Sequence, residues 1–206
     1  MHNRLLITIT GILLAGPFTV SHAGGDAQAG EEIHMEICKD CHGEAGVSAF
    51  DEWPSLAGQT EDYTRHHLTM FRAEERYDPM MLMTGNAAEL SDQDIADLAA
   101  FYAGLEPAVH EADPELAERG RQIYHAGLPE EGVAACTACH GPAGAGVEAA
   151  KFPRVGGQHA AYLAASLKAF KTAERQTDRN QMMREIAERM SDEDIEAVAS
   201  YMSGLH

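Results

Sequence analysis

The sequence is poor in basic side chains. Its 206 residues include 15 lysines and arginines against 33 aspartates and glutamates, a formal net charge of −18. A surface with this charge repels nucleic acids and anionic lipid headgroups, and it favours partners with basic docking patches. We therefore expect no nucleic-acid ligand.

Long apolar runs are also scarce, and the longest lies near the start. Arg4 precedes the uncharged stretch Leu5 to Leu14, which is too short to span a bilayer comfortably. Gly16 and Pro17 then break any helix, and Ser21-His22-Ala23 places small residues where signal peptidase cleaves. Residues 1–23 therefore predict a cleaved signal peptide and export to the periplasm. An uncleaved N-terminal anchor is the alternative.

The rest of the chain is a tandem repeat. Three segments recur in the same order: 38–42 at 136–140, 54–59 at 153–158, and 90–95 at 190–195. The offset grows only from 98 to 100 residues, which predicts equivalent domains with small loop insertions. We expect one domain at 24–106 and a second at 115–206. Residues 107–114 contain two prolines and no hydrophobic period, and we assign them as the linker.

Helical periodicity runs through both copies. Apolar side chains recur at three- and four-residue steps in 61–73 and 159–171, and again after two Ser-Asp motifs. Side chains suited to capping helix N-termini stand at Asp26, Ser91, Asp113 and Ser191. No alternating run suggests a sheet, so the predicted class is all-α. Three or four short helices per domain bury little apolar surface, and we expect a bound group to complete each core.

Two Cys-x-x-Cys-His pentapeptides predict that this group is haem. Two thiols three residues apart can each add to one vinyl group of a porphyrin, and the adjacent imidazole then binds the iron. The residues concerned are Cys38, Cys41 and His42 in the first copy, and Cys136, Cys139 and His140 in the second. We therefore expect two covalently bound c-type haems.

Cysteine pairs of this kind also occur in zinc ribbons, redox-active dithiols and structural disulfides. A zinc ribbon brings its two pairs within about 15 to 20 residues, whereas these pairs lie in separate repeats. A redox-active dithiol of the thioredoxin type needs a βαβ setting, and the pattern shows none. Disulfides are the default in an exported protein. The histidine that follows both pairs favours haem over all three.

Methionine is the second iron ligand best suited to electron transfer, because its thioether raises the reduction potential. The candidates are Met80, Met81, Met83, Met182 and Met183. Only Met83 and Met183 share a repeat position, seven residues before the third repeated segment, so we assign them as the sixth ligands. The remaining methionines are expected to serve as adaptable packing.

Residues near the ligands have other expected roles. A ligating imidazole normally donates its second N–H to an acceptor such as a carbonyl, and we expect Pro54 and Pro153 to supply that carbonyl. His66, His67 and His159 lie in predicted helices at unmatched repeat positions. We expect surface or capping roles for these three.

Over its whole mature length the sequence resembles the cytochrome c4 family of two-domain dihaem cytochromes of bacterial periplasms. The matching features are both pentapeptides, both methionine loops, Pro-x-Leu-x-Gly-Gln59, Phe152-Pro-x-Val-Gly-Gly-Gln-His-Ala-Ala-Tyr162, and the two Ser-Asp-x-Asp-Ile segments. The resemblance implies two cytochrome c folds with their haems close together. It also implies electron delivery to a terminal oxidase or similar acceptor, loose membrane association, and the iron ligands His42, Met83, His140 and Met183.

These features predict an electron carrier with redox protein partners, no small-molecule substrate and no enzymatic activity. A cytochrome subunit of a dehydrogenase complex is one alternative. A dihaem peroxidase is another, but it needs an open iron position where both repeats offer a methionine.

Charge differs between the two copies. Residues 24–106 carry 18 acidic and 4 basic side chains, whereas 107–206 carry 15 and 10. This asymmetry serves either solubility or the docking of different partners on the two domains.

Overall fold

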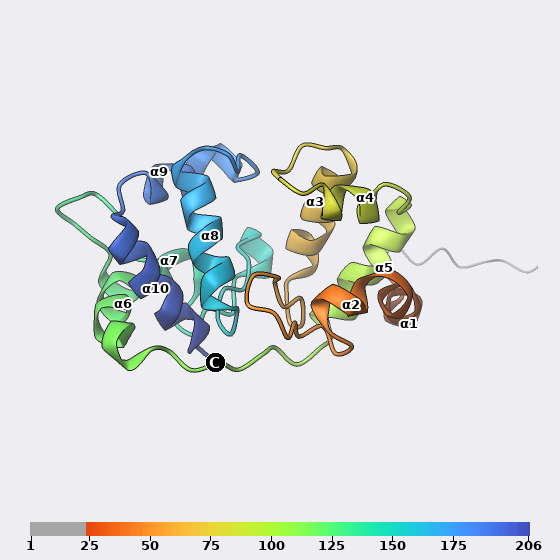
Figure 1. Ribbon diagram of the computed structural model, residues 1–206, viewed down its shortest axis with the longest axis horizontal. Helices are drawn as coiled ribbons and strands as arrows, with labels where there is room; N and C mark the ends of the chain where they lie inside the picture. The colour runs from red at the N-terminus through yellow and green to blue at the C-terminus, as the bar shows by residue number, and fades with distance from the viewer. Residues whose placement is uncertain (1–23) are drawn as a thin grey trace, which may run out of the picture.

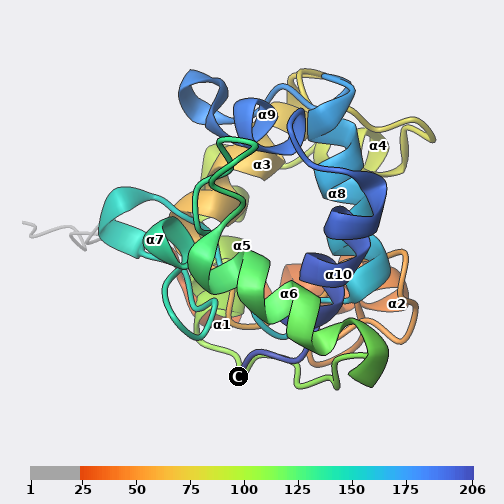
Figure 2. The ribbon, with the colours of Figure 1, turned by 90° about the vertical axis from the view of Figure 1, so that its left-hand side faces the viewer.

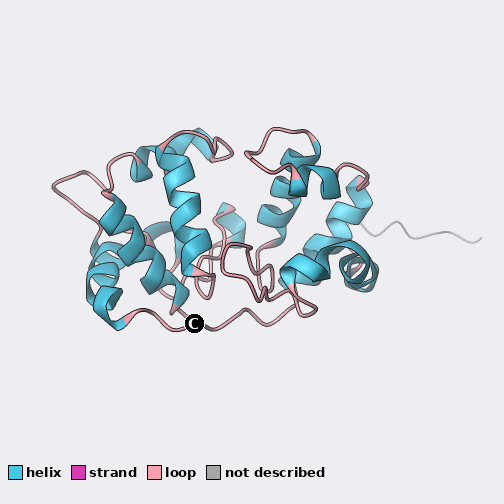
Figure 3. Cartoon of the chain, in the orientation of Figure 1, coloured by secondary structure: helices cyan, strands magenta, loops and turns pink. Residues whose placement is uncertain are grey.

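A computed structural model describes residues 24–206 of the chain. The expected signal peptide, residues 1–23, lies outside the described residues. Within them the secondary structure is helical, with no strand and only two isolated bridges, Leu128 with Val133 and Val147 with Phe152 (Figure 3). The all-α prediction is confirmed.

The helices form two lobes of the same order (Figure 1). The first contains α1 (Ala27–Ile33), α2 (Lys39–His42), α3 (Glu61–Arg72), α4 (Leu82–Ala87) and α5 (Asp92–Ala103). The second contains α6 (Pro114–Ala126), α7 (Thr137–His140), α8 (Ala160–Lys171), α9 (Met182–Ala187) and α10 (Asp192–Ser203). Short helical turns also occur at His34–Cys38, Glu148–Ala150 and Arg179–Gln181. An extended segment along one side of the molecule joins α5 to α6 (Figure 1).

Each lobe is built on a close crossing of its first and last helices, α1 with α5 and α6 with α10; the second pair lies in front in Figure 2. Gly30 and Gly120 make this approach possible. A β-carbon on Gly30 would lie 2.2 Å from the carbonyl oxygen of Asp97, and one on Gly120 would lie 2.2 Å from that of Ala197. The crossings therefore have no room for a side chain at either glycine.

Helix ends follow the expected caps. The Asp26 and Asp113 side chains accept from backbone N–H groups in the first turns of α1 and α6. Ser91 forms a reciprocal capping box with Asp94 at the start of α5, with aspartate in place of the usual glutamate. Ser191 accepts from the N–H of Asp194 at the start of α10.

The path into the Cys-x-x-Cys-His turn differs between the lobes. Cys38 follows Asp26 by 12 residues, and α1 reaches it through a π-helical turn, His34–Cys38. Cys136 follows Asp113 by 23 residues, because a loop closed by the Leu128–Val133 bridge intervenes. The small drift between the repeated segments therefore holds from the pentapeptides onward, and the second copy has an additional loop before its pentapeptide.

Candidate functional site

The two histidines of the pentapeptides are buried in equivalent positions. His42 ends α2 and His140 ends α7, with 6% and 8% exposure. The Nδ1 atom of His42 lies 2.8 Å from the carbonyl oxygen of Pro54, and that of His140 lies 2.9 Å from the oxygen of Pro153. The expected hydrogen bonds to proline carbonyls are confirmed. Since a carbonyl only accepts, Nδ1 carries the proton and Nε2 remains as the electron-pair donor.

Burial also sets the protonation state of these rings. It lowers the pKa of His42 and of His140, and this effect outweighs the hydrogen bonds to Pro54 and Pro153, which act in the opposite direction. The neutral imidazole is the form that binds a metal.

The four cysteines are free thiols, each partly exposed. Burial raises the pKa of Cys38, and it raises that of Cys136 to about 11. A redox-active dithiol needs the opposite shift, because the thiolate is the reactive form. The site therefore does not fit the dithiol alternative.

The methionines divide into two groups by their burial. Met83 and Met183, each the second residue of its helix, are partly buried and pack against the core clusters that Cys38 and Cys136 also contact. By contrast, Met80, Met81 and Met182 are 67%, 53% and 37% exposed. The two methionines that share a repeat position are therefore the ones that pack against the same core clusters as Cys38 and Cys136.

The first turns of α4 and α9 are fixed in the same way. The Asp78 carboxylate accepts from the backbone N–H of Thr84 at 2.8 Å, and Asp178 accepts from that of Arg184 at 3.0 Å. These contacts hold the turns that carry Met83 and Met183.

The glycine after each pentapeptide is held by a hydrogen bond that the sequence analysis did not predict. Gly43 and Gly141 follow the two histidines with φ of 77° and 79°. His34 reaches the carbonyl of Gly43 through Nε2 at 3.0 Å, and the Tyr124 hydroxyl donates to the carbonyl of Gly141 at 2.5 Å. The supports are different residue types at different distances from the motif, so the repeat pattern carried no signal for them.

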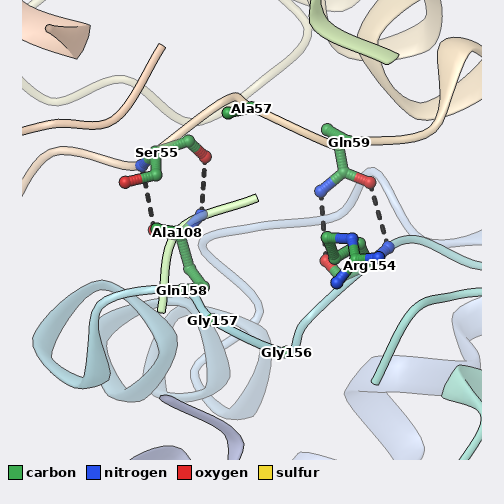
Figure 4. Close-up of a pocket in the computed structure, with 8 residues that line it drawn as sticks. All are labelled: Ser55, Ala57, Gln59, Ala108, Arg154, Gly156, Gly157 and Gln158. Atoms are coloured by element: carbon green, nitrogen blue, oxygen red, sulfur yellow. Dashed lines mark hydrogen bonds between the residues drawn. The ribbon is translucent and has the colours of Figure 1, made fainter. Parts of the chain in front are cut away.

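The domain boundary is held by a reciprocal exchange of glutamine side chains. The Gln59 amide donates to the carbonyl of Arg154 and accepts from its N–H, both at 3.0 Å. Gln158 does the same with Ser55, at 2.8 and 2.9 Å (Figure 4). A cavity of about 10 Å³ lies between these pairs, room for about one water molecule.

Three histidines near this boundary, His66, His67 and His159, were expected to have surface or capping roles. His67 is 6% exposed and packs against Tyr63, so the surface role expected for it is wrong. His66 meets the carbonyl of Thr177 at 3.2 Å. His159 occupies the N-cap position of α8, but its side chain makes no capping hydrogen bond and instead contacts the carbonyl of Ser48 in the other lobe at 3.0 Å.

The donor sets fit haem c. Each lobe offers two free thiols, a buried neutral imidazole with one nitrogen unused, and a thioether beside the same apolar core. The family model for cytochrome c matches residues 27–106 and 117–206.

Comparison with whole proteins shows which two-domain cytochromes this chain resembles. A cytochrome c4 of Thiocapsa roseopersicina is 47% identical over 88% of this chain and 93% of its own length. The crystal structure of reduced recombinant cytochrome c4 from Pseudomonas stutzeri superposes with a TM-score of 0.85 at 40% identity, covering 88% of this chain and all of that one. The chain belongs to the cytochrome c4 family.

As a cytochrome c4 family member, the chain binds two covalently attached haem c groups and is a dihaem electron-transfer cytochrome. A further relative, a thiosulfate dehydrogenase electron acceptor of Stutzerimonas stutzeri, is 38% identical over 86% of this chain and 83% of its own length. Between residues 24 and 206, none of the helices has the length and apolar character needed to cross a bilayer.

Proposed function

We propose that this cytochrome carries single electrons in the periplasm, between respiratory-chain donors and a terminal oxidase or similar acceptor. Its first iron is bound by His42 and Met83 and its second by His140 and Met183, with thioether attachment at Cys38, Cys41, Cys136 and Cys139. The observation that carries this proposal is the repeated geometry: in each lobe a buried imidazole has Nδ1 occupied by a proline carbonyl, and a methionine borders the same core.

Haem c supplies a one-electron iron couple, and the chain's own residues tune it. The carbonyls of Pro54 and Pro153 fix the orientation of the imidazoles and increase their basicity. The thioethers of Met83 and Met183 would bind the two irons together with the imidazoles and would favour the reduced state. His42 and His140 are buried, which would shield their imidazoles from water.

Residues 1–23 are proposed to direct export and to be removed after Ala23. The mature chain then consists of a domain at 24–106, a linker at 107–114 and a domain at 115–206. Loose association with the membrane, through protein partners there, completes the proposal.

A fixed partner is the second candidate function. It is favoured by the relative of Stutzerimonas stutzeri that is an electron acceptor of thiosulfate dehydrogenase. The same role here would make the chain the cytochrome partner of a dehydrogenase. Copurification of a dehydrogenase with the chain at native expression would support this role, and recovery of the cytochrome alone would favour a free carrier.

The ligand assignment is tested by Met83→Leu and Met183→Leu in the purified holoprotein. Each variant should lose about half of the far-red methionine-to-iron absorption band, because one of two thioethers is gone, and should lower one reduction potential. The matched control is Met80→Leu, whose side chain is 67% exposed and which should keep the full band. An unchanged band in Met83→Leu would remove Met83 from the ligand set.

A further inference from the structure

The peptide group between Pro54 and Ser55 is hydrogen-bonded at both of its ends. Its carbonyl oxygen, which belongs to Pro54, accepts from Nδ1 of His42 at 2.8 Å. Its N–H, which belongs to Ser55, donates to Oε1 of Gln158 at 2.9 Å. Because the carbonyl and the N–H belong to one planar, conjugated unit, the two bonds form a single chain from the imidazole to a side chain of the other domain.

The second domain contains the same chain, running in the opposite direction across the boundary. The carbonyl oxygen of Pro153 accepts from Nδ1 of His140 at 2.9 Å. The N–H of the same peptide group belongs to Arg154 and donates to Oε1 of Gln59 at 3.0 Å. Figure 4 shows the two glutamine contacts side by side. Each domain therefore supplies the last member of the other domain's chain.

The orientation of both glutamine amides is fixed by further hydrogen bonds. Oε1 of Gln59 also accepts from the N–H of Thr60 at 2.9 Å, and Oε1 of Gln158 accepts from that of His159 at 3.0 Å. Their amide nitrogens donate to carbonyl oxygens of the other domain. A rotated amide would set donor against donor at each oxygen position, so the oxygen must face the N–H of the chain.

These chains lie in surroundings that strengthen them. The exposed fractions of Ser55, Gln59 and Gln158 are 6%, 8% and 9%. Where water is excluded, hydrogen bonds in a chain polarise one another. Donation from the N–H therefore makes the carbonyl oxygen of the same peptide group a stronger acceptor for the histidine.

Holding the domains together would not by itself require this placement. Other hydrogen bonds cross the boundary away from the iron-binding histidines, such as that of His66 with the carbonyl of Thr177. Gln59 and Gln158 instead bind, in each domain, the one peptide group that carries the acceptor of the histidine.

We propose that Gln59 and Gln158 are positioning residues for electron transfer, and that each sets the basicity of the iron-binding histidine in the other domain. Gln158 acts on His42, and Gln59 acts on His140. A stronger carbonyl acceptor makes the imidazole a more basic ligand, which stabilises ferric iron. The reduction potential of each haem therefore depends on a side chain of the neighbouring domain. The inference rests on the proposed iron ligation by these two histidines.

The test is a redox titration of the holoprotein carrying Gln158→Leu or Gln59→Leu, followed by NMR so that the two haems are resolved and assigned. In Gln158→Leu the carbonyl of Pro54 becomes a weaker acceptor. The ratio of reduced to oxidised first haem at a fixed applied potential should then rise about threefold, which corresponds to about 28 mV, while the second haem stays unchanged. Gln59→Leu should give the reverse pattern.

The matched control is Gln122→Leu, which removes an exposed glutamine of α6 that bonds only to Glu118 and should leave both potentials unchanged. A boundary that is merely loosened would shift both haems in either variant. Equal shifts of the two haems, a shift confined to the domain that carries the substitution, or potentials that match the control would each overturn the proposal. Gln158→Met, which keeps the length of the side chain, and Gln59→Leu decide the matter if Gln158→Leu fails to fold.

The same spectra separate this inference from the proposed function. Hyperfine-shifted Nδ1–H resonances of His42 and His140 in the parent protein would report that both imidazoles bind iron. Their absence would overturn the proposed ligands and this inference with them. Their presence, with potentials that do not respond to the glutamine variants, would overturn this inference alone.

Discussion

At the scale of single residues, Gln59 and Gln158 join the two domains by hydrogen bonds from their side chains to the backbone of the other domain. Each primary amide presents one donor and one acceptor, which matches the N–H and carbonyl of one backbone residue. The N–H and carbonyl of Ser55 are buried, so bulk water cannot take over their bonds if Gln158 is lost.

Gln158→Leu should therefore lower the free energy of unfolding by about 1–3 kcal/mol, since the N–H and carbonyl of Ser55 lose their partners while remaining buried. Denaturant unfolding of the holoprotein measures this change. Gln122→Leu is the control: Gln122 is exposed and bonds only to Glu118, and its loss should change stability by less than about 0.5 kcal/mol. Equal effects in the two variants would mean that the glutamine exchange contributes nothing.

The sequence predicted those site residues that occupy equivalent positions in the two repeats. The pentapeptides, the proline carbonyls and the register of Met83 and Met183 followed from equivalent spacing. His34 and Tyr124, which hold Gly43 and Gly141, could not be found this way, because two different residue types perform one task. The surface role expected for His67 is wrong for a related reason: one of its contacts is with Arg175 of the other domain, and no local periodicity reports a contact across 108 residues.

At the scale of elements, the two glycine crossings fix where the first and last helices meet. Both β-carbons would collide with backbone carbonyls of α5 and α10, which cannot move without shifting a whole helix. Sequence periodicity predicted the helices and their caps, but it could not give the crossing, because a glycine on a helix face looks the same whether it contacts solvent or another backbone.

Gly30→Ala and Gly120→Ala should each lower the free energy of unfolding by about 1–3 kcal/mol or more through overpacking. Gly85→Ala is the matched control: Gly85 lies inside α4 and a β-carbon there meets nothing within 4 Å. Alanine at that position should raise stability by about 0.5–1 kcal/mol, because it restricts the unfolded chain. Thermal unfolding followed by circular dichroism distinguishes the three variants, and a Gly120→Ala protein as stable as Gly85→Ala would exclude a tight crossing.

At the scale of the whole molecule, charge separates the two domains. Some of the acidic excess of the first domain is used at the boundary, where Asp62 pairs with Lys151 at 2.9 Å and with Arg179 at 3.1 Å. Glu31 and Glu32 of α1 are exposed, and none of the ion pairs within residues 24–206 includes them, which leaves them available to a basic redox partner.

Replacing Glu31, Glu32 and Glu36 by glutamine should therefore slow electron transfer to a basic redox partner and weaken the dependence of its rate on salt. The control is the same change at Glu115, Glu130 and Glu131, which are exposed on the second domain. Stopped-flow rates over a range of ionic strength give the comparison. If both triple variants behave alike, the asymmetry serves solubility and does not select a docking face.

The tandem repeat predicted two domains, but it could not predict the contacts between them. The contacts that hold the lobes together join residues about 100 positions apart, such as Gln59 with Arg154 and Arg175 with Tyr63. Gln59 and Gln158 occupy equivalent positions of the repeat, but repetition alone cannot show that each copy binds the backbone of the other.

The central claim, two equivalent iron centres that are both closed by methionine, is tested most directly by one redox titration of the purified holoprotein, followed through its visible spectrum. We predict two one-electron waves, ferric haems that are low-spin throughout, and a far-red band with the intensity of two methionine–iron bonds. A high-spin ferric haem that binds cyanide rapidly would contradict the claim, because it would show an open iron position of the kind a peroxidase requires.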